Sequence, residues 1–357
     1  MRALLILTVR NEGAFLIDWL AWHRHVGFTD FLVFSNDCTD GTDLMLDRLA
    51  AMGWLTHVPN PGPHEKGAQW AALKAANAHP LKQRADWVLT ADIDEYVMIH
   101  AGDGRLADLF AALPEATAIP LTWRLFGNGG VIRRDGRPVP EAFTRAAPAV
   151  MGWPWRAAMF KTLIRNDGSY RALGVHRPKD STPEGLARQR WFDGSGRELP
   201  ADFHTARLFS PFGRDNYGLV QLNHYALGSM EDYVLKCDRG RANRAASAFD
   251  LSYWVERNLC AVEDRALADR FPAARSETAA LRADPALAEL ETRARGWRSD
   301  RFRQLMADEA YRSLLGRLMM APHSRLLSER ESRFLFDLAR QNQWDPAAGT
   351  DGAPETR

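Results

Sequence analysis

Residues 85–97 read Ala-Asp-Trp-Val-Leu-Thr-Ala-Asp-Ile-Asp-Glu-Tyr-Val, and this stretch decides the fold. The short apolar run at 87–91 is typical of a buried strand, and three carboxylates, Asp92, Asp94 and Glu95, follow at its carboxyl end. Side chains alternate along an extended backbone, so Asp92 and Asp94 lie on one side, where each negative charge raises the pKa of the other. The pattern therefore predicts a cation between them.

A divalent metal is the simplest counterion for these acids. Carboxylate oxygens are the usual ligands of hard ions such as Mg²⁺ and Mn²⁺, which commonly keep coordination positions open for substrate phosphates. The alternative is structural, because acids at the end of a strand can also cap a following turn or helix. The other motifs of the chain decide between the two.

The composition is that of a soluble globular protein. The chain has 357 residues, 46% hydrophobic and 25% charged, a length that suggests one large domain with an addition or two modest domains. The chain has 46 Lys and Arg residues and 45 Asp and Glu residues, which gives a formal charge of +1. The overall charge therefore does not favour binding to nucleic acid. Three cysteines without C-x-x-C spacing argue against a disulfide framework or a zinc knuckle. No apolar run approaches the roughly 18 residues that span a bilayer, and we expect a cytoplasmic protein.

Strand and helix patterns alternate in the first half of the chain. The predicted strands are 3–9, 31–34, 56–58, 87–91 and 118–123, and the predicted helices are 15–27, 44–52, 68–78 and 106–113. This alternation predicts an α/β fold with a mainly parallel central sheet, right-handed crossovers and flanking helices. Ligands of such sheets bind at the carboxyl ends of the strands. The loops 10–13, 35–42 and 92–95 fall at that edge.

Patterns in the second half are less regular. Strands are predicted at 159–164 and 220–226, and Ser229 is an N-cap candidate for a helix that continues to Arg244. The proline-containing stretch 133–155 is either an acceptor-facing lid or a packed irregular loop. The chain beyond is expected to form a helical appendage and a disordered tail. The predicted helices of the appendage are 251–268, 285–295, 301–318 and 328–343, and the tail is 345–357.

Several motifs follow one another in a characteristic order. They are Arg10-Asn11-Glu12, the run SNDCTDGT at 35–42, Asp92-Ile93-Asp94-Glu95, Lys161, His176, and the segment from His224-Tyr225 through Lys236 to Arg239-Gly240. Together they resemble bacterial family 2 glycosyltransferases of the GT-A fold, in the Asp-x-Asp-Glu branch related to family 92 and to domain of unknown function 23. The resemblance covers 1–244 and implies a nucleotide-sugar half at about 1–100 and an acceptor half at about 101–244. It does not assign the appendage at 245–344.

The resemblance implies transfer of a sugar from a nucleotide-diphosphate sugar to an acceptor hydroxyl. A divalent metal, Mn or Mg, would bridge the donor phosphates and the two aspartates. The expected setting is synthesis of cell-surface polysaccharide or glycoconjugate, with a glycan, a lipid-linked molecule or another hydroxyl compound as acceptor. Peripheral contact with the inner face of the membrane is a further expectation, because the Arg-bearing C-terminal helices suit a membrane surface; a solvated helical face is the alternative.

Site residues are carried over by position. The metal ligands implied by the resemblance are Asp92, Asp94 and His224. The residues implied for the nucleotide sugar are Thr8, Arg10, Asn11, Glu12, Asn36, Asp37, Lys66, Asp92, Lys161, Lys236 and Arg239. In one place the chain departs from the family, because Ser35 and Asn36 stand where two leading aspartates are usual. Asn36 or Asp37 is expected to replace the carboxylate contact to the nucleobase.

The catalytic base is the hardest residue to assign from sequence. Deprotonation of an acceptor hydroxyl needs a carboxylate or an imidazole near it. His176 lies in the acceptor half and is our first candidate. Glu95 lies beside the predicted metal site and is the second candidate. The alternative for Glu95 is a supporting role, in which it orients Asp94. Asp202 or His204 is a third option.

Two other classes of protein, a different metal-dependent enzyme and an inactive scaffold, are compatible with acids at strand ends. A nucleotidyltransferase, or a sugar-phosphate hydrolase, would also hold a metal there. A nucleotidyltransferase would typically have a Gly-rich basic loop after its first strand, whereas residues 10–13 contain a single glycine. The other alternative is an inactive carbohydrate-binding or assembly protein on the same scaffold. Trp123, Trp153 and Trp155 could stack on sugars in either case, but intact Asp92 and Asp94 argue against inactivity.

Overall fold

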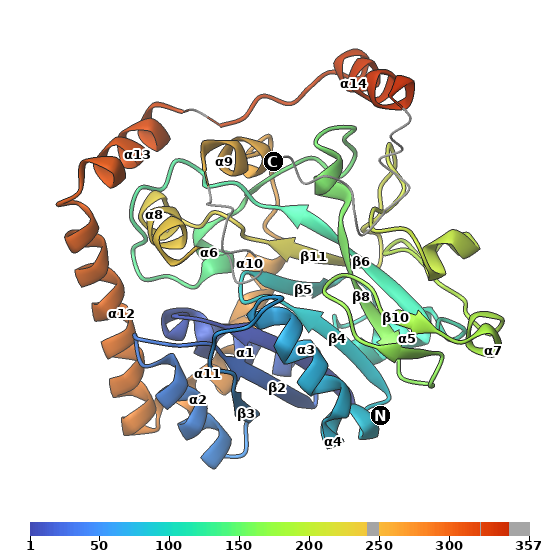
Figure 1. Ribbon diagram of the computed structural model, residues 1–357, viewed down its shortest axis with the longest axis horizontal. Helices are drawn as coiled ribbons and strands as arrows, with labels where there is room; N and C mark the ends of the chain where they lie inside the picture. The colour runs from blue at the N-terminus through green and yellow to red at the C-terminus, as the bar shows by residue number, and fades with distance from the viewer. Residues whose placement is uncertain (241–249, 322, 343–357) are drawn as a thin grey trace.

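An eight-stranded sheet forms the centre of the computed structural model, which describes residues 1–240, 250–321 and 323–342 (Figure 1). The order of its strands is β3-β2-β1-β4-β8-β6-β11-β5. These strands are β1 (Ala3–Val9), β2 (Asp30–Ser35), β3 (Thr56–Pro59), β4 (Trp87–Ala91), β5 (Glu95–Ile99), β6 (Ala118–Leu125), β8 (Phe160–Arg165) and β11 (Val220–His224). The short strands β7 (Arg145–Ala146), β9 (Tyr170–Ala172), β10 (Lys179–Ser181) and β12 (Val262–Glu263) form two small ribbons.

The first half of the sheet is parallel, as the alternating patterns predict. β1 pairs with β2 and β4, and β2 pairs with β3, all in parallel; β6 and β11 are also parallel. The pairings β4–β8, β6–β8 and β5–β11 are antiparallel. Four of the seven pairings are therefore parallel, and the expected α/β class with a mainly parallel sheet is confirmed.

Helices cover both faces of the parallel half because its strands are apolar on both sides. Leu5 and Leu7 of β1 belong to one core cluster with α1 (Gly13–Val26) and α2 (Thr42–Ala51). Leu4 and Ile6, which point to the other face, pack with α3 (Ala68–Ala78). The remaining helices of this region are α4 (Pro80–Arg84), α5 (Leu106–Ala112), α6 (Val139–Ala142) and α7 (Pro183–Leu186), with 3₁₀ turns at Trp155–Ala158 and Ala201–His204.

Strand β5 is an element that the sequence patterns did not identify. It starts at Glu95, directly after the two aspartates, and all five of its residues are buried. It pairs antiparallel with β11, so that His224 lies opposite Glu95 in the register. This pairing brings the end of a late strand to the acidic stretch.

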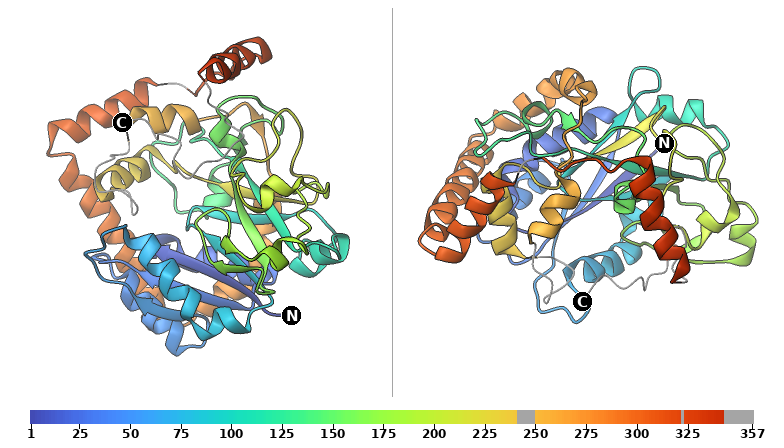
Figure 2. Two further views of the ribbon diagram at one scale, coloured as in Figure 1. Left: turned by 45° about the vertical axis from the view of Figure 1, so that its right-hand side comes forward. Right: turned by 90° about the horizontal axis from the view of Figure 1, so that it is seen from above.

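The C-terminal helices pack against the sheet domain instead of standing apart from it. Leu281, Leu287 and Ala294 belong to the same core cluster as β1 and α1, and Arg282 forms ion pairs with Asp18 of α1 (3.0 Å) and with Glu291 (2.7 Å). Figures 1 and 2 show α12 along the side of the molecule next to α1 and α2. The helices are α8 (Met230–Arg239), α9 (Leu251–Arg257), α10 (Ala266–Arg270), α11 (Arg275–Arg282), α12 (Pro285–Leu305), α13 (Glu309–Met320) and α14 (Glu329–Gln341), with a 3₁₀ turn at Phe271–Ala274.

Four of the predicted helix boundaries in this region are wrong. The helix predicted at 285–295 continues to Leu305. The helix predicted at 251–268 ends at Arg257, because Asn258 turns to accept a hydrogen bond from the backbone N–H of Asn128 (2.9 Å). The helix predicted at 301–318 is two helices, because Asp308 caps a new one at Ala310 N (2.8 Å). The helix after Ser229, whose predicted N-cap is confirmed, ends at Arg239 instead of Arg244, which lies outside the described residues. The predicted tail 345–357 also lies outside them.

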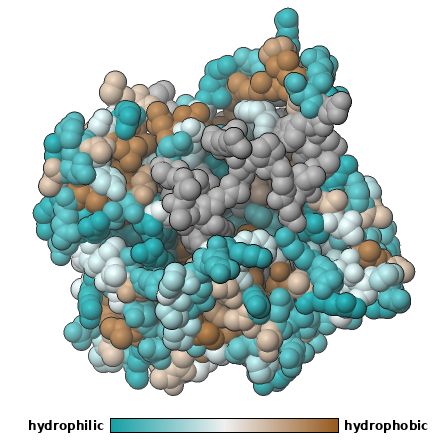
Figure 3. Space-filling model, viewed as in Figure 1, coloured by the Kyte–Doolittle hydropathy of each residue, from teal (hydrophilic) through white to brown (hydrophobic). Residues whose placement is uncertain are grey.

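Apolar side chains are exposed on the last two helices. Met320 of α13 is 83% exposed and Phe334 of α14 is 61% exposed; Figure 3 shows the hydrophobic group on α14 at the upper right. None of the described helices is long and apolar enough to cross a membrane. Contact of these helices with a membrane surface stays a prediction.

Stability at acidic pH is predicted to depend on His23, which α1 buries completely. Its Nδ1–H donates to Trp19 O (2.9 Å) and its Nε2 accepts from Val97 N (3.2 Å). Burial lowers the pKa of His23 from 6.5 to about 3. Because the folded protein holds the neutral imidazole, the stability from this residue is complete above pH 6.5 and falls as the pH drops toward 3.

In His23→Gln this dependence disappears. The stability advantage of the parent over the variant should shrink by about 2 kcal/mol between pH 7 and pH 5, since each pH unit below the unfolded-state pKa is worth about 1.4 kcal/mol. Urea unfolding of both proteins at the two pH values measures this difference. A difference in unfolding free energy between parent and variant that is the same at pH 7 and pH 5 would contradict the assignment of a neutral, buried imidazole to His23.

Candidate active site

Hydrogen bonds join the loops after β1 and β2 at the carboxyl edge of the sheet. Asn11 Oδ1 accepts from Thr39 N (2.7 Å), and Asn36 Nδ2 donates to Val9 O (2.9 Å). Asn11 and Asp37 have positive φ angles of 57° and 46°. Asn and Asp adopt this left-handed conformation more readily than other side chains, which explains their place in these loops.

Each aspartate of the acidic stretch is paired with a lysine from elsewhere in the chain. Lys161 of β8, completely buried, donates to Asp92 Oδ2 (2.9 Å). Lys236 of α8 donates to Asp94 Oδ2 (2.9 Å). The two lysines come from segments that are distant in sequence, and they supply the positive charge that the carboxylates require.

Glu95 lies beneath the two aspartates and has no exposed surface. Its carboxylate accepts from Trp123 Nε1 (2.7 Å) and from Asp92 N (2.9 Å), and lies 3.7 Å from Lys161 Nζ. Burial raises the pKa of Glu95, against the opposing effect of Lys161. These contacts orient Trp123 and the turn at Asp92, and they leave no surface of Glu95 for a substrate to reach.

Asp94 and His224 are held in the protonation states of metal ligands. Burial alone would raise the pKa of Asp94, but the positive charge of Lys236 outweighs it, and the pKa is lowered to about 2. Burial lowers the pKa of His224 to about 3, so its imidazole is neutral. Its Nε2 lies 3.8 Å from Asp94 Oδ1, too far for a hydrogen bond.

The metal site expected at Asp92, Asp94 and His224 stays a prediction. An ionised carboxylate and a neutral imidazole at this separation fit two ligands of one divalent ion. The third predicted ligand, Asp92, accepts from Lys161 and from Gln69 Nε2 (3.2 Å). Within the ranges that the structure describes, no group of three or more His, Cys, Asp or Glu residues could hold a metal.

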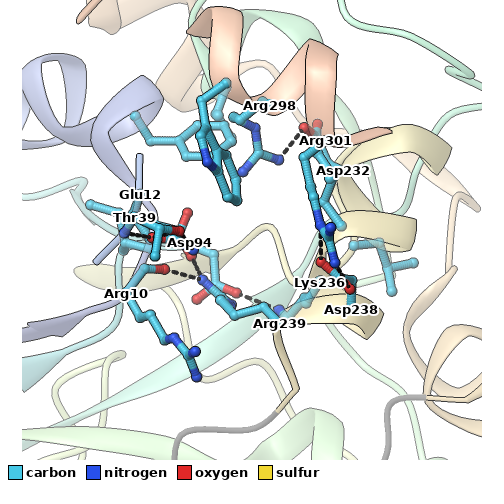
Figure 4. Close-up of a pocket in the computed structure, with 18 of the residues that line it drawn as sticks. Arg10, Glu12, Thr39, Asp94, Asp232, Lys236, Asp238, Arg239, Arg298 and Arg301 are labelled. Atoms are coloured by element: carbon cyan, nitrogen blue, oxygen red, sulfur yellow. Dashed lines mark hydrogen bonds and ion pairs between the residues drawn. The ribbon is translucent and has the colours of Figure 1, made fainter. Parts of the chain in front are cut away.

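A cavity of about 400 Å³ adjoins Asp94 (Figure 4). Its walls come from the loops after β1, β2, β4 and β11, from α8 and from α12. Six of the residues predicted for the donor or the metal line it: Arg10, Asn11, Glu12, Asp94, Lys236 and Arg239. The structure thus brings together residues that lie more than 200 positions apart in the chain.

Arg239 connects α8 to the loop after β1 across this cavity. It forms an ion pair with Glu12, and its Nη1 donates to Arg10 O (3.1 Å). Burial, together with the nearby guanidinium groups of Arg298 and Arg10, lowers the pKa of Arg239 to about 10. Three guanidinium groups therefore approach one another here, an arrangement that favours a bound anion.

The other predicted site residues do not line the cavity. Thr8 is half-buried in β1, Asn36 is buried, and Lys66 is exposed. Asp37 accepts from Gly62 N (3.2 Å) in the loop after β3. The residues outside the lining are Thr8, Asn36, Asp37, Lys66, Asp92, Glu95, Lys161, His176 and His224.

The candidate bases lie outside the cavity lining. His176 Nδ1 is 3.0 Å from Phe160 O, and its ring contacts Trp123 (centroids 5.5 Å apart). His224 contacts the same indole at 4.3 Å. His204 contacts Trp191 in a different core cluster, and Asp202 pairs with Arg207 (2.7 Å). Of the candidates outside the acidic stretch, His176 is joined to it through Trp123, which donates to Glu95.

Several site residues were absent from the sequence-based set. Trp123 and Gln69 bind the acidic stretch directly, and Trp297, Arg298 and Arg301 of α12 line the cavity. From sequence Trp123 is considered only as a side chain that could stack on a sugar, and nothing in the pattern of β6 signals its bond to Glu95. Nothing in the local pattern of α12 distinguishes its cavity-lining residues from a charged solvent face.

Comparison with known proteins identifies related sequences. The profile of glycosyltransferase family 92 matches residues 8–187. A family 92 glycosyltransferase protein of Oryza sativa subsp. japonica is 23% identical over 142 residues, which are 38% of this chain and 23% of that protein. One from Ricinus communis is 28% identical over 97 residues, 26% of this chain and 16% of that protein. The chain spans under a quarter of the length of these curated relatives.

Solved structures show only distant similarity. The crystal structure of S. aureus TarS 1-349 in complex with UDP-GlcNAc is 14% identical, covers 96% of this chain and 93% of that chain, and has a TM-score of 0.31. The structure of TarS 1-349 without that ligand covers 88% and 92%, at 14% identity and a TM-score of 0.33. Values this low carry no argument about the site.

Removal of Lys161 should strongly destabilise the protein. Lys161→Met leaves the buried carboxylate of Glu95 and that of Asp92 without their cation, and loss of one partner from a buried pair costs about 3–5 kcal/mol of folding free energy. Urea unfolding measures it against Arg165→Met, at the exposed end of the same strand, which should change stability by about 0.5 kcal/mol or less. Equal stabilities of the two variants would contradict the role of Lys161. The double variant Lys161→Met with Glu95→Gln should regain part of the stability lost in Lys161→Met alone.

Proposed function

This chain belongs to glycosyltransferase family 92, and from that premise we propose that it transfers a sugar from a nucleotide-diphosphate sugar to an acceptor hydroxyl. One observation carries the proposal: six residues that the sequence motifs assign to the donor or its metal line a single cavity at the carboxyl edge of the sheet. That edge is where ligands of open α/β sheets bind. The family match supports the same class of reaction.

The cationic side chains of the cavity suit a diphosphate leaving group. Negative charge grows on the diphosphate as the glycosidic bond breaks, and fixed cations stabilise that charge. Lys236 and Arg239 are the proposed contacts, with Arg10 at the edge of the cavity. Asn11 holds the loop after β1 in place through Thr39, which keeps Arg10 and Glu12 at the cavity wall.

We propose that Asp94 and His224 hold a divalent metal, Mn or Mg, with Asp92 as the third predicted ligand. When bound, such an ion would neutralise charge on the donor phosphates and take its remaining ligands from them. The ionised state of Asp94 and the neutral state of His224 support this assignment. The pair with Lys236 keeps Asp94 ionised, and Lys161 binds Asp92.

His176 is the proposed base for the acceptor hydroxyl. It lies beside Trp123, whose indole also contacts His224, and so stands close to the acidic stretch but outside the cationic cavity. This separation suits an acceptor that approaches from the side opposite the diphosphate. Glu95 is assigned a positioning role, because it is fully buried against Trp123 and Asp92.

The acceptor and the cellular setting stay predictions from the sequence. They comprise a glycan, lipid-linked or other hydroxyl acceptor, a role in cell-surface polysaccharide or glycoconjugate synthesis, and a cytoplasmic protein in peripheral contact with the membrane. A nucleotidyltransferase or an inactive carbohydrate-binding protein are the alternatives, and each gives a distinct result with nucleotides.

Asp94→Asn should abolish metal-dependent donor binding. The substitution removes a charge at nearly constant size, so we expect the affinity for a nucleoside diphosphate in Mn²⁺ to fall at least tenfold and to become insensitive to chelator. Calorimetric titration with nucleoside diphosphates and nucleotide sugars measures this, with exposed Asp103→Asn as the control.

Unchanged metal-dependent affinity in Asp94→Asn would contradict the metal assignment. A folded parent protein that binds no nucleotide under any condition would favour the inactive scaffold. Formation of a nucleotide sugar from a nucleoside triphosphate and a sugar phosphate would favour the nucleotidyltransferase.

His176→Gln should separate binding from transfer. Donor affinity should stay within twofold of the parent because His176 does not line the cavity, while the rate of transfer should fall roughly 100-fold or more, as expected for loss of a general base. His79→Gln, at the junction of α3 and α4, is the matched control. Transfer at the parental rate in His176→Gln would place the base elsewhere.

A further inference from the structure

Helix α12 forms one wall of the cavity although it lies outside the matched region 8–187. Trp297, Arg298, Arg301 and Gln304 belong to the lining. Figure 4 shows Arg298 and Arg301 across the opening from Arg10 and Glu12. The sequence motifs gave this helix no role, so its part in the site is new information from the structure.

The spacing along α12 explains how one helix can serve both core and cavity. Leu287, Glu291 and Ala294 are buried toward α1 and α2, whereas Trp297, Arg301 and Gln304 follow at intervals of four and three residues. Such intervals place side chains on one helical face. The last two turns of α12 therefore present a continuous face to the cavity.

Ion pairs fix this face relative to α8. Arg298 Nη2 lies 2.7 Å from Asp232 Oδ1, and the guanidinium of Arg298 covers the ring of Phe15 at 4.6 Å. Arg301 binds Asp238 through two bonds, Nε to Oδ2 (2.8 Å) and Nη2 to Oδ1 (2.7 Å). Because α8 also carries Lys236 and Arg239, the wall is held at a set distance from the proposed phosphate contacts.

The cavity has two chemically different parts. Arg10, Lys236 and Arg239 supply cations near Asp94, while aromatic and aliphatic side chains line the remainder, among them Phe15, Phe143, Leu235 and Trp297. A nucleoside diphosphate has the same division between a charged end and a flat, largely apolar base. Aromatic side chains bind bases of any identity by stacking, and amide or guanidinium groups read their polar edges.

We propose that α12 is the nucleoside-reading wall of the donor cavity: Trp297 stacks on the base, and Arg301 with Gln304 contacts its polar edge. This inference rests on the proposed function, since it requires a nucleotide donor. Gln304 Oε1 lies 3.4 Å from Arg301 Nη1, so the two side chains form one polar unit beside the indole.

Binding of nucleoside diphosphates and of inorganic pyrophosphate to the full chain tests the assignment. Trp297→Ala should weaken the best-binding nucleoside diphosphate about tenfold or more, the scale of one base–aromatic stack. Pyrophosphate affinity should stay within twofold, because pyrophosphate has no base to stack. Trp297→Phe should keep most of the nucleotide affinity. Arg303→Gln, on the same helix but exposed and paired with Asp300, is the control and should bind both ligands as the parent does.

Gln304→Ala provides a second test that does not disturb the core, because Gln304 is exposed. The ratio of affinities for purine and pyrimidine diphosphates should change at least threefold. Parental nucleotide affinity in Trp297→Ala, equal losses of nucleotide and pyrophosphate, or a change confined to the KM of the acceptor would each overturn the inference. Absence of nucleotide binding in the parent protein would instead refute the proposed function.

Discussion

The pairing of the strand-end carboxylates with Lys161 and Lys236 is the interaction on which the rest of the site depends. Asp92 and Asp94 follow the end of β4, and burial would raise the pKa of Asp94 there without a nearby positive charge. Lys161 and Lys236 provide it from β8 and α8. The same two contacts therefore neutralise the acidic stretch and connect the parallel half of the sheet to the later part of the chain.

Further ion pairs extend this constraint outward. Lys236 fixes α8, and α8 in turn binds the loop after β1 through Arg239 and binds α12 through Asp232 and Asp238. The cavity is the space that these connected elements enclose. Its cationic side chains are consequently held in place by carboxylates before any ligand binds, so little rearrangement is needed to receive an anion.

The sequence was sufficient for the parts of the fold that local patterns encode. The βαβα alternation, the position of the acidic stretch and the Ser229 cap each rest on periodicity or on a short motif, and the structure confirms them. The loops at the carboxyl edge could be placed because parallel strands bring their ends together. The order of motifs was enough to gather six of the cavity residues, from Arg10 to Arg239.

Features that depend on tertiary contacts could not be predicted. The break at Asn258 follows from its bond to the backbone of Asn128, which no local pattern signals. From sequence Trp123 is a candidate only for stacking on a sugar, yet its indole N–H binds Glu95. Trp297 joins the cavity only because α12 packs along α1 and α2. In each case a partner more than 20 residues away determines the role of the residue.

The cavity between the β1 loop, α8 and α12 is the proposed site of the nucleotide donor. The most direct measurement is a crystal structure of the protein with a nucleoside diphosphate and Mn²⁺, in which anomalous scattering locates the metal. We expect the diphosphate beside Lys236 and Arg239, the metal at Asp94 and the base against α12. A nucleotide bound instead along Asp37 and Lys66, with the cavity empty, would contradict this assignment.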